Sequence, residues 1–310
     1  MATYTSPELV AAVSNAGGLG VHGSLGRDPG ELRALIRATR ELCGARPFGV
    51  NLVLSRLDEA AFALCLEERV PVLCFSWGDP GDTARRAGEA RAAGAKVVCQ
   101  VATVAEVPAA LAAGADALIA QGTEGGGHSG FVPLAALLPA VVEAAGETPV
   151  LAAGGIVDGR GLAVALALGA AGGWLGTRFL ATPETPIDPA WKAALVAARP
   201  GDTVHTRAFD TLWGTPWPAA RVRALRNRFT DEWDGREAAL AEQLPEVQRA
   251  VWRAERAGDP SLICLMAGAG AGLIRDIRPA GDLVREIVAE AEAVIGRLAR
   301  LADGTADAGG

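Results

Sequence analysis

Residues 149–179 read PVLAAGGIVDGRGLAVALALGAAGGWLGTRF, and this stretch decides the fold. A short apolar run ends at two glycines, an alanine-rich run of helical length follows, and a second apolar run comes directly after Gly172. A helix that ends at glycine and leads straight into a buried strand is typical of the βα unit. Since strands joined through a helix lie parallel in one sheet, the stretch predicts an α/β fold.

The same pattern of alanine-rich run, glycine and branched apolar run recurs along the first 180 residues. Helix starts are marked by a capping oxygen directly before a proline, as in Asp28-Pro29 and Asp79-Pro80. The strands between the helices are apolar on both faces, as a parallel sheet covered by helices requires. They are expected near residues 19–22, 48–53, 71–75, 96–101, 116–120, 149–153 and 173–176.

The number of strands and the position of the loops bear on the architecture. A doubly wound sheet binds its ligand at one switch point, whereas here glycine-rich loops follow several strands, which favours the rim of a (β/α)8 TIM barrel. Seven strands are counted where a closed barrel needs eight, and the first helix begins at residue 6 with no strand before it. We therefore expect a TIM barrel that lacks its first strand, with two exposed sheet edges that invite pairing.

The pattern changes after residue 180. Five of the seven tryptophans lie beyond it among prolines and arginines, which indicates a helical, tryptophan-rich insertion or lid over the rim. A last helix near 281–301 carries one apolar stripe and is expected to close the barrel from outside. The predicted division is a barrel of residues 1–180 and 262–301, an insertion at 181–261 and a disordered tail at 302–310.

Composition excludes several classes of protein. The 310 residues are 50% hydrophobic and 21% charged, so a large core is available, and the net charge of -7 argues against a nucleic-acid surface. No apolar run reaches the roughly 18 residues that a membrane helix needs. Five scattered cysteines and three distant histidines form no disulfide or metal-site pattern, so we expect no metal and a reducing, cytoplasmic location. GxSxG and Walker motifs are absent.

The segment AQGTEGGGHSG at 120–130 follows a predicted strand directly. Three consecutive glycines allow the backbone to approach a flat ligand, and the loop presents His128 at the rim. A neutral imidazole there could take a proton from a carbon acid near neutral pH. The alternative is a polar loop with a solvated histidine.

Two further glycine turns end the last two predicted strands. Gly154 and Gly155 follow one strand, and Gly176 and Thr177 follow the next, 22 residues later. If one strand precedes the first of the seven, these are the loops after the seventh and eighth strands of a barrel. Those two loops commonly bind phosphate through backbone N–H groups and a hydroxyl. We therefore favour a phosphate-bearing ligand, with simple tight turns as the alternative.

Polar side chains at other strand ends are weaker candidates. Asn51 and Gln121 could hydrogen-bond the carbonyl or imide of a ligand, or simply face water at the end of a strand. His22 ends a strand and His205 lies in the insertion, and both are expected to be structural or to face solvent.

Together, five segments resemble the signature of nitronate monooxygenases, a family of flavoenzymes. The resemblance is strong over about residues 5–182, and flavin-dependent enoyl-ACP reductases share the same barrel and several of the motifs. The segments are SPELVAAVSNAGGLGV, PFGVNLV, AQGTEGGGHSG, PVLAAGGIVDGRGLAVALALGA and WLGTRFLAT.

The resemblance implies a (β/α)8 barrel that holds FMN without a covalent bond. The loop histidine of the family matches His128, as a general base or as a group that holds the nitronate anion. Three departures stand out. Gly125 replaces a usual alanine, and Trp174 replaces a common glutamine. Met1 aligns with the methionine of an opening strand, so we expect the true start upstream, with a genuinely shortened chain as the alternative. The implied FMN contacts are Asn51 and Gln121 at the ring and ribityl part, Gly126 against the cofactor, Gly154, Gly155, Gly176 and Thr177 at the phosphate, and Trp174 and Leu175 along the last strand.

The activity implied by the resemblance is oxidative denitrification. A nitronate or nitroalkane would be oxidised with O2 to a carbonyl compound and nitrite, with FMN as the redox group. The first alternative is an FMN-dependent enoyl-ACP reductase that uses NAD(P)H, and the second is a non-catalytic flavin-binding barrel. The aromatic and proline-rich segments beyond residue 180 make a homodimer a further hypothesis.

Overall fold

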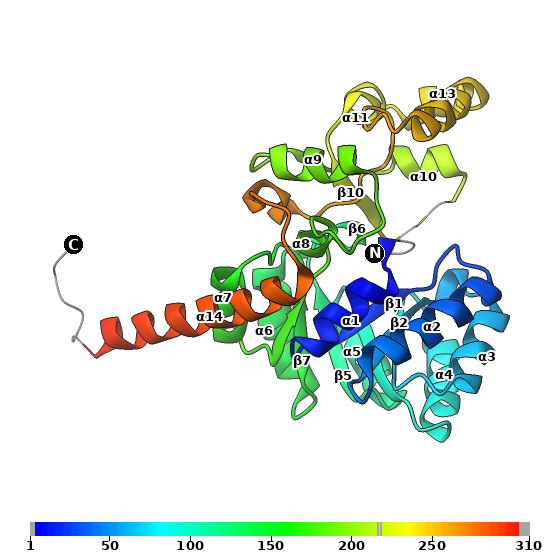
Figure 1. Cartoon of the computed structure of the whole chain (residues 1–310). Coiled ribbons are helices and arrows are strands. Elements are labelled where there is room, and N and C mark those ends of the chain that lie inside the picture. The colour runs from blue at the N-terminus through cyan, green and yellow to red at the C-terminus, as the bar shows by residue number, and fades with distance from the viewer. Residues whose placement is uncertain (1–3, 216, 218, 304–310) are drawn as a thin grey trace.

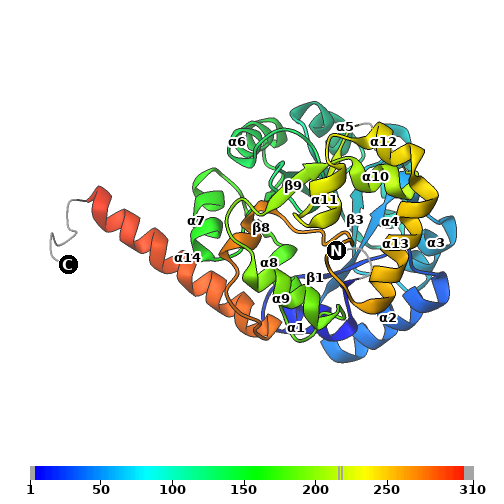
Figure 2. The ribbon, with the colours of Figure 1, turned by 90° about the horizontal axis from the view of Figure 1, so that it is seen from above.

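A computed structural model describes residues 4–215, 217 and 219–303. Its main feature is a curled, parallel sheet of seven strands in the order β1-β2-β3-β4-β5-β7-β8 (Figures 1 and 2). Each strand coincides with one of the seven predicted runs, so this part of the prediction is confirmed. The strands are β1 Gly20–Gly23, β2 Phe48–Val53, β3 Val72–Ser76, β4 Lys96–Val101, β5 Ala117–Gln121, β7 Val150–Ala153 and β8 Gly172–Trp174.

Helices cover the outer face of the sheet, as the alternating pattern predicts (Figure 2). The carboxylates of Asp28 and Asp79 accept hydrogen bonds from backbone N–H groups in the first turns of α2 and α4, which confirms the predicted helix starts. The helices are α1 Pro7–Asn15, α2 Pro29–Cys43, α3 Glu59–Glu67, α4 Pro80–Ala92, α5 Val107–Ala112, α6 Leu134–Ala145 and α7 Gly159–Ala167, with short 3₁₀ turns η2 Leu54–Arg56 and η3 Val104–Glu106.

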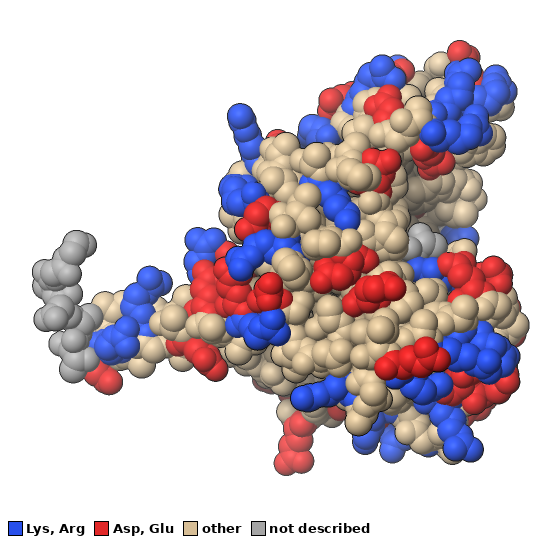
Figure 3. Space-filling view, viewed as in Figure 1, with Lys and Arg blue, Asp and Glu red and all other residues tan. Residues whose placement is uncertain are grey.

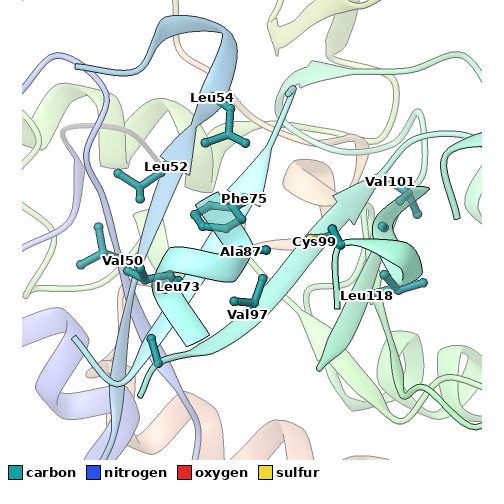
Figure 4. Packing of buried hydrophobic residues seen from close by; sticks show 14 of the residues in the cluster. Val50, Leu52, Leu54, Leu73, Phe75, Ala87, Val97, Cys99, Val101 and Leu118 are labelled. Atoms are coloured by element: carbon teal, nitrogen blue, oxygen red, sulfur yellow. The ribbon is translucent and has the colours of Figure 1, made fainter. Parts of the chain in front are cut away.

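Alternation along each strand builds two apolar layers. In β3, Leu73 and Phe75 point outward into the core beneath the helices (Figure 4), whereas Val72 and Cys74 belong to a second cluster on the inner face. The inner cluster also contains Trp174. Since each fully buried Leu or Phe contributes about 1.5–3 kcal/mol, burial on both faces fixes the register of the sheet.

The sheet is a barrel with one strand fewer than eight. β1 and β8 are the two ends of the strand order, and among the described residues no strand pairs with the outer edge of either. Behind this gap, α1 packs against the final helix, α14, which also packs on α7. The fold is thus the predicted α/β TIM barrel with an open side.

The region above the rim combines helices with a second sheet (Figure 1). The predicted insertion was described as helical, and its strands were missed. The strand β10 is only five residues long, RVRAL, and includes two arginines, so its sequence is a weak strand signal. Val222 and Ala224 of this strand are buried in a separate apolar core. The strand order is β6-β10-β9, antiparallel, and β6 comes from the predicted glycine-rich loop. These elements are β6 Gly127–Ser129, α8 Thr177–Leu180, α9 Pro189–Ala197, β9 Thr203–Thr206, α10 Ala208–Trp213, β10 Arg221–Leu225, α11 Arg228–Trp233, α12 Glu237–Glu242 and α13 Leu244–Ala257.

The chain returns to the barrel through η4 (Ala269–Leu273) and α14 (Ala280–Ala302). Leu283 and Ile287 are buried, as the predicted stripe requires, but Leu298 and Leu301 are 50% and 58% exposed. The reason is that the second half of α14 extends past α7 and projects from the body (Figures 1 and 2). The helix includes residue 302, Asp303 caps it, and residues 304–310 of the predicted tail lie outside the described residues.

Candidate functional site

A cavity of about 690 Å³ lies where the strands of the barrel end and extends into the gap between β1 and β8. Its volume falls in the range of about 300–1,000 Å³ that is usual for ligand pockets. The ends of six strands contribute to its wall, and apolar side chains of α1, α7 and α14 line its outer part. Barrel enzymes bind their ligands at this rim.

All nine residues that the sequence nominates for cofactor contact line this cavity. The glycine turns after β7 and β8 and the loop after β5 meet here, although they are far apart in the sequence. The nine are Asn51, Gln121, Gly126, Gly154, Gly155, Trp174, Leu175, Gly176 and Thr177.

Part of the wall consists of backbone alone. A Cβ atom on Gly126 would lie 2.6 Å from the backbone nitrogen of Gly268, and one on Gly154 would lie 3.0 Å from that of Gly125. Gly154 and Gly155 also have φ angles of 115° and 74°, which side chains other than hydrogen rarely permit. Glycine at these positions lets the three loops pack together and exposes their peptide groups to the cavity.

These peptide groups leave hydrogen-bond donors free. Within the described residues, the backbone N–H groups of Gly154, Gly155 and Gly176 donate to no other group. The Thr177 hydroxyl accepts a hydrogen bond from the Gly268 N–H at 2.9 Å, so its own proton remains available. No arginine or lysine is among the described residues that line the cavity. An anionic group would therefore be held by neutral donors, a chemistry suited to phosphate.

Amide side chains lie in the carboxyl-terminal halves of β2, β4 and β5. The Gln121 Oε1 atom accepts a hydrogen bond from Gln100 Nε2 at 3.0 Å, and the Asn51 amide lies 3.5 Å from the Ser76 hydroxyl. Since an amide both donates and accepts, this group can match the edge of a flat heterocycle. Gln100 was not predicted; it is the residue before the last of β4, whereas Gln121 is the last residue of β5.

Trp174 and Leu175 form the apolar part of the wall near β8. The indole of Trp174 packs against the inner cluster of the barrel, which includes Ile119 and Ala153. Leu175 packs on the opposite side, against Leu9 and Phe179. The tryptophan that departs from the family pattern thus fills the barrel interior while it lines the cavity.

His128 lies in β6, within the predicted glycine-rich loop. In β6, His128 pairs with Val222 of β10. Because successive residues of a strand face opposite sides of the sheet, the His128 side chain lies on the side opposite to the one that Gly127 faces. Gly126 and Gly127 line the cavity, but His128 is not among the described lining residues. Instead, its Nε2 atom lies 2.8 Å from Oδ1 of Asp210 on α10, and Trp217 stacks on its ring with centroids 4.0 Å apart.

The other two histidines have structural partners. His22 lines the cavity, but its Nε2 and Nδ1 atoms lie 2.6 and 3.3 Å from the hydroxyls of Thr39 and Thr5. Burial, with a further contribution from Arg27, lowers the pKa of His22 to about 4. His205 Nε2 lies 3.1 Å from the backbone carbonyl of Arg221, and burial lowers its pKa. Both rings are neutral near pH 7.

Two parts of the site escaped the sequence analysis. Gly268 and Gly270 line the cavity from the segment MAGAGAG at 266–272, whose glycine spacing was a usable signal. Asp210 gave no such signal, because 82 residues separate it from His128.

The described part of the chain contains neither a candidate cluster of metal ligands nor a candidate membrane-spanning helix. No group of three or more His, Cys, Asp or Glu side chains is placed there to hold a metal ion. None of its helices is long and apolar enough to cross a membrane. On the face shown in Figure 3, basic and acidic side chains are interspersed over the barrel.

Comparison with known proteins adds a family. A family model described as nitronate monooxygenase matches residues 1–63 and 58–290. The (3aS,4S,5R,7aS)-5-hydroxy-7a-methyl-1-oxo-octahydro-1H-indene-4-carboxyl-CoA dehydrogenase of Rhodococcus jostii is 39% identical over 211 residues, which cover 68% of this chain and 58% of that protein. The match thus spans less than two thirds of that relative.

Two solved structures are similar over nearly the whole chain. FabK from Thermotoga maritima has a TM-score of 0.85 at 37% identity and covers 96% of this chain and 93% of its own. Nitroalkane oxidase from Streptomyces ansochromogenes has a TM-score of 0.83 at 32% identity, with coverages of 96% and 94%.

Proposed function

Because the chain belongs to the nitronate monooxygenase family, and so is a flavin-dependent oxidoreductase, we propose that it binds FMN and oxidises alkyl nitronates with O2 to carbonyl compounds and nitrite. The observation that carries this proposal is the joint placement of free backbone donors and strand-end amides in one cavity. The FMN would supply the electron-transfer chemistry that side chains lack.

The residues present fit FMN. The N–H groups of Gly154, Gly155 and Gly176 and the hydroxyl of Thr177 would hold the phosphate. The amides of Asn51 and Gln121, with Gln100 beside them, would match the polar edge of the ring system. Gly126 would allow the ring to approach the backbone closely, and Trp174 and Leu175 would cover apolar surface.

His128 would act on the substrate. A nitroalkane is a carbon acid, and a neutral imidazole can take its α-proton, which leaves the nitronate anion. A protonated imidazole would in turn hold the nitronate by charge. Gly126 and Gly127, which precede His128, line the cavity, and the proposal requires the ring to reach a substrate bound beside them.

The test is nitrite release. Purified protein loaded with FMN is given propyl-2-nitronate in air without NAD(P)H, and nitrite and oxygen consumption are measured. The proposal predicts nitrite in step with oxygen uptake. No nitrite above a flavin-only control would refute it.

The similarity to FabK, at 37% identity, favours a second candidate, an FMN-dependent enoyl-ACP reductase that uses NAD(P)H. The same preparation is therefore given NADPH and a crotonyl thioester under argon. Oxidation of NADPH that requires the thioester, with no nitrite from the nitronate, would select this candidate. Flavin binding with neither activity would select the non-catalytic barrel.

The expected homodimer stays a prediction. Light scattering of the purified protein at micromolar concentration would test it. A mass of one chain would refute it.

A further inference from the structure

The environment of His128 contains a buried carboxylate. Asp210 lies on α10, its side chain is 6% exposed, and its Oδ1 atom is 2.8 Å from His128 Nε2. Its second oxygen, Oδ2, is buried and has no hydrogen-bond partner among the described residues. A buried carboxylate with one partner depends strongly on that partner, because an unpaired charge is costly to bury.

The pairing distinguishes the two nitrogen atoms of the imidazole. An ionised carboxylate only accepts hydrogen bonds, so Nε2 must carry the hydrogen in this contact. In the neutral ring Nδ1 then holds the lone pair. No described residue forms a hydrogen bond with Nδ1. This atom is therefore the one left to take a proton.

Aromatic rings pack around the imidazole of His128. Trp217 stacks on the imidazole with an interplanar angle of 19°, and Trp77 meets Trp217 edge-on at 5.4 Å. The guanidinium of Arg56 lies over Trp217, 5.4 Å from its ring centroid. On the other side of the pair, burial and then the charges of Asp210 and Glu255 raise the pKa of Cys264 well above its usual value. Charged groups near the pair include Arg56 over Trp217 and Glu255 beside Cys264, and Arg221 and Arg223 flank Val222, the residue of β10 that pairs with His128.

We propose that Asp210 is a positioning residue that fixes His128 as the Nε2–H tautomer and stabilises its protonated form. This rests on the proposed function. In the step concerned, the α-C–H bond of a nitroalkane breaks, the proton forms an N–H bond at Nδ1, and the electron pair moves into the nitro group. Nothing is oxidised in this step. The carboxylate balances the positive charge that the ring gains.

The proposal separates two substrates. A neutral nitroalkane needs the proton transfer, whereas a preformed nitronate does not. Asp210→Asn should therefore lower turnover of nitroethane by about 100-fold or more, the range for a lost acid/base function, and affect ethylnitronate much less. The pH profile of nitroethane turnover should also differ between the wild type and Asp210→Asn, because the variant removes the buried charge beside the ring.

Two control variants accompany the test. Asp210→Glu keeps the charge and should restore part of the nitroethane turnover. Asp231→Asn removes a carboxylate of the same region whose side chain is 59% exposed. It should leave the turnover of both nitroethane and ethylnitronate unchanged. All variants are compared at equal flavin content and after their melting temperatures have been measured. Asp210→Asn behaviour equal to that of Asp231→Asn on both substrates and in pH profile would overturn the proposal.

A second measurement does not depend on activity. The chain has only three histidines, so ring ¹⁵N resonances can be assigned with single variants of the other two. At neutral pH the wild type should show Nε2 protonated and Nδ1 unprotonated for His128, and Asp210→Asn should lose this single tautomer. An unchanged tautomer and titration in Asp210→Asn would refute the role of Asp210. Absence of nitronate oxidation in the wild type would instead refute the proposed function alone.

Discussion

Replacing Thr177 by valine tests the phosphate site with the smallest change of shape. The Thr177 hydroxyl accepts a hydrogen bond from the Gly268 N–H at 2.9 Å, and its proton is available to a phosphate oxygen. Valine keeps the volume and the branched Cβ but removes both interactions. Serine at this position keeps both and loses only a methyl group.

The size of the effect follows from these two bonds. A hydrogen bond to a charged group is worth about 1.5–3 kcal/mol, which corresponds to a roughly 10- to 100-fold weaker Kd for FMN. In Thr177→Val the Gly268 N–H also loses its acceptor, which destabilises the fold by a further ~1–3 kcal/mol. Because this loss is the same with and without ligand, it lowers the melting temperature and leaves the FMN affinity unchanged. Thr177→Ser should stay within about threefold of wild type in FMN affinity, because both hydrogen bonds persist.

The assay is titration of flavin-free protein with FMN and, separately, with riboflavin, followed by quenching of flavin fluorescence. Riboflavin lacks the phosphate, so Thr177→Val should bind it as the wild type does. Wild-type FMN affinity in Thr177→Val would refute a phosphate at this turn. Equal weakening for FMN and riboflavin would show that the hydroxyl acts only through Gly268.

Three further predictions test other parts of the account. Gly155→Val should lose FMN, because a branched residue disfavours the φ of 74° at this position. The control Gly146→Val, at a φ of 59° with open space around it, should lower stability but keep the flavin. The flavin released on denaturation is measured for each variant. His128→Ala should keep the flavin and lower nitroethane turnover by about 100-fold, and unchanged nitrite production would exclude the ring from the reaction. Burial lowers the pKa of His22 to about 4, so on acidification the unfolded chain binds this proton before the folded chain does. The free energy of unfolding, measured with urea, should therefore fall by up to about 3 kcal/mol as the pH drops from 6.5 to 4. An equal fall with pH in His22→Gln would contradict this.

Local signals predicted the barrel well. The capping carboxylates of Asp28 and Asp79 and the glycine turns between helix and strand act within a few residues, so the sequence displays them directly. The same holds for the cavity-lining residues at strand ends, because parallel strands bring their carboxyl ends to one rim. This is why Asn51, Gln121 and the turns at Gly154 and Gly176 share one cavity.

Contacts between distant segments were not predictable in this way. The small sheet depends on β6 pairing with β10, where His128 lies opposite Val222. His128 Nε2 then lies 2.8 Å from Oδ1 of Asp210, a partner that the sequence did not indicate. The Thr177–Gly268 hydrogen bond joins residues 91 positions apart. No spacing rule covers such pairs, since they arise only when the upper region folds onto the rim.

The most direct test of the central claim is an anaerobic titration of the purified protein with propyl-2-nitronate, followed by absorbance. We expect a yellow protein that releases FMN on denaturation and whose flavin band bleaches with the nitronate alone and returns in air. A colourless protein that does not take up added FMN, or a flavin band that NADPH bleaches and the nitronate does not, would contradict it.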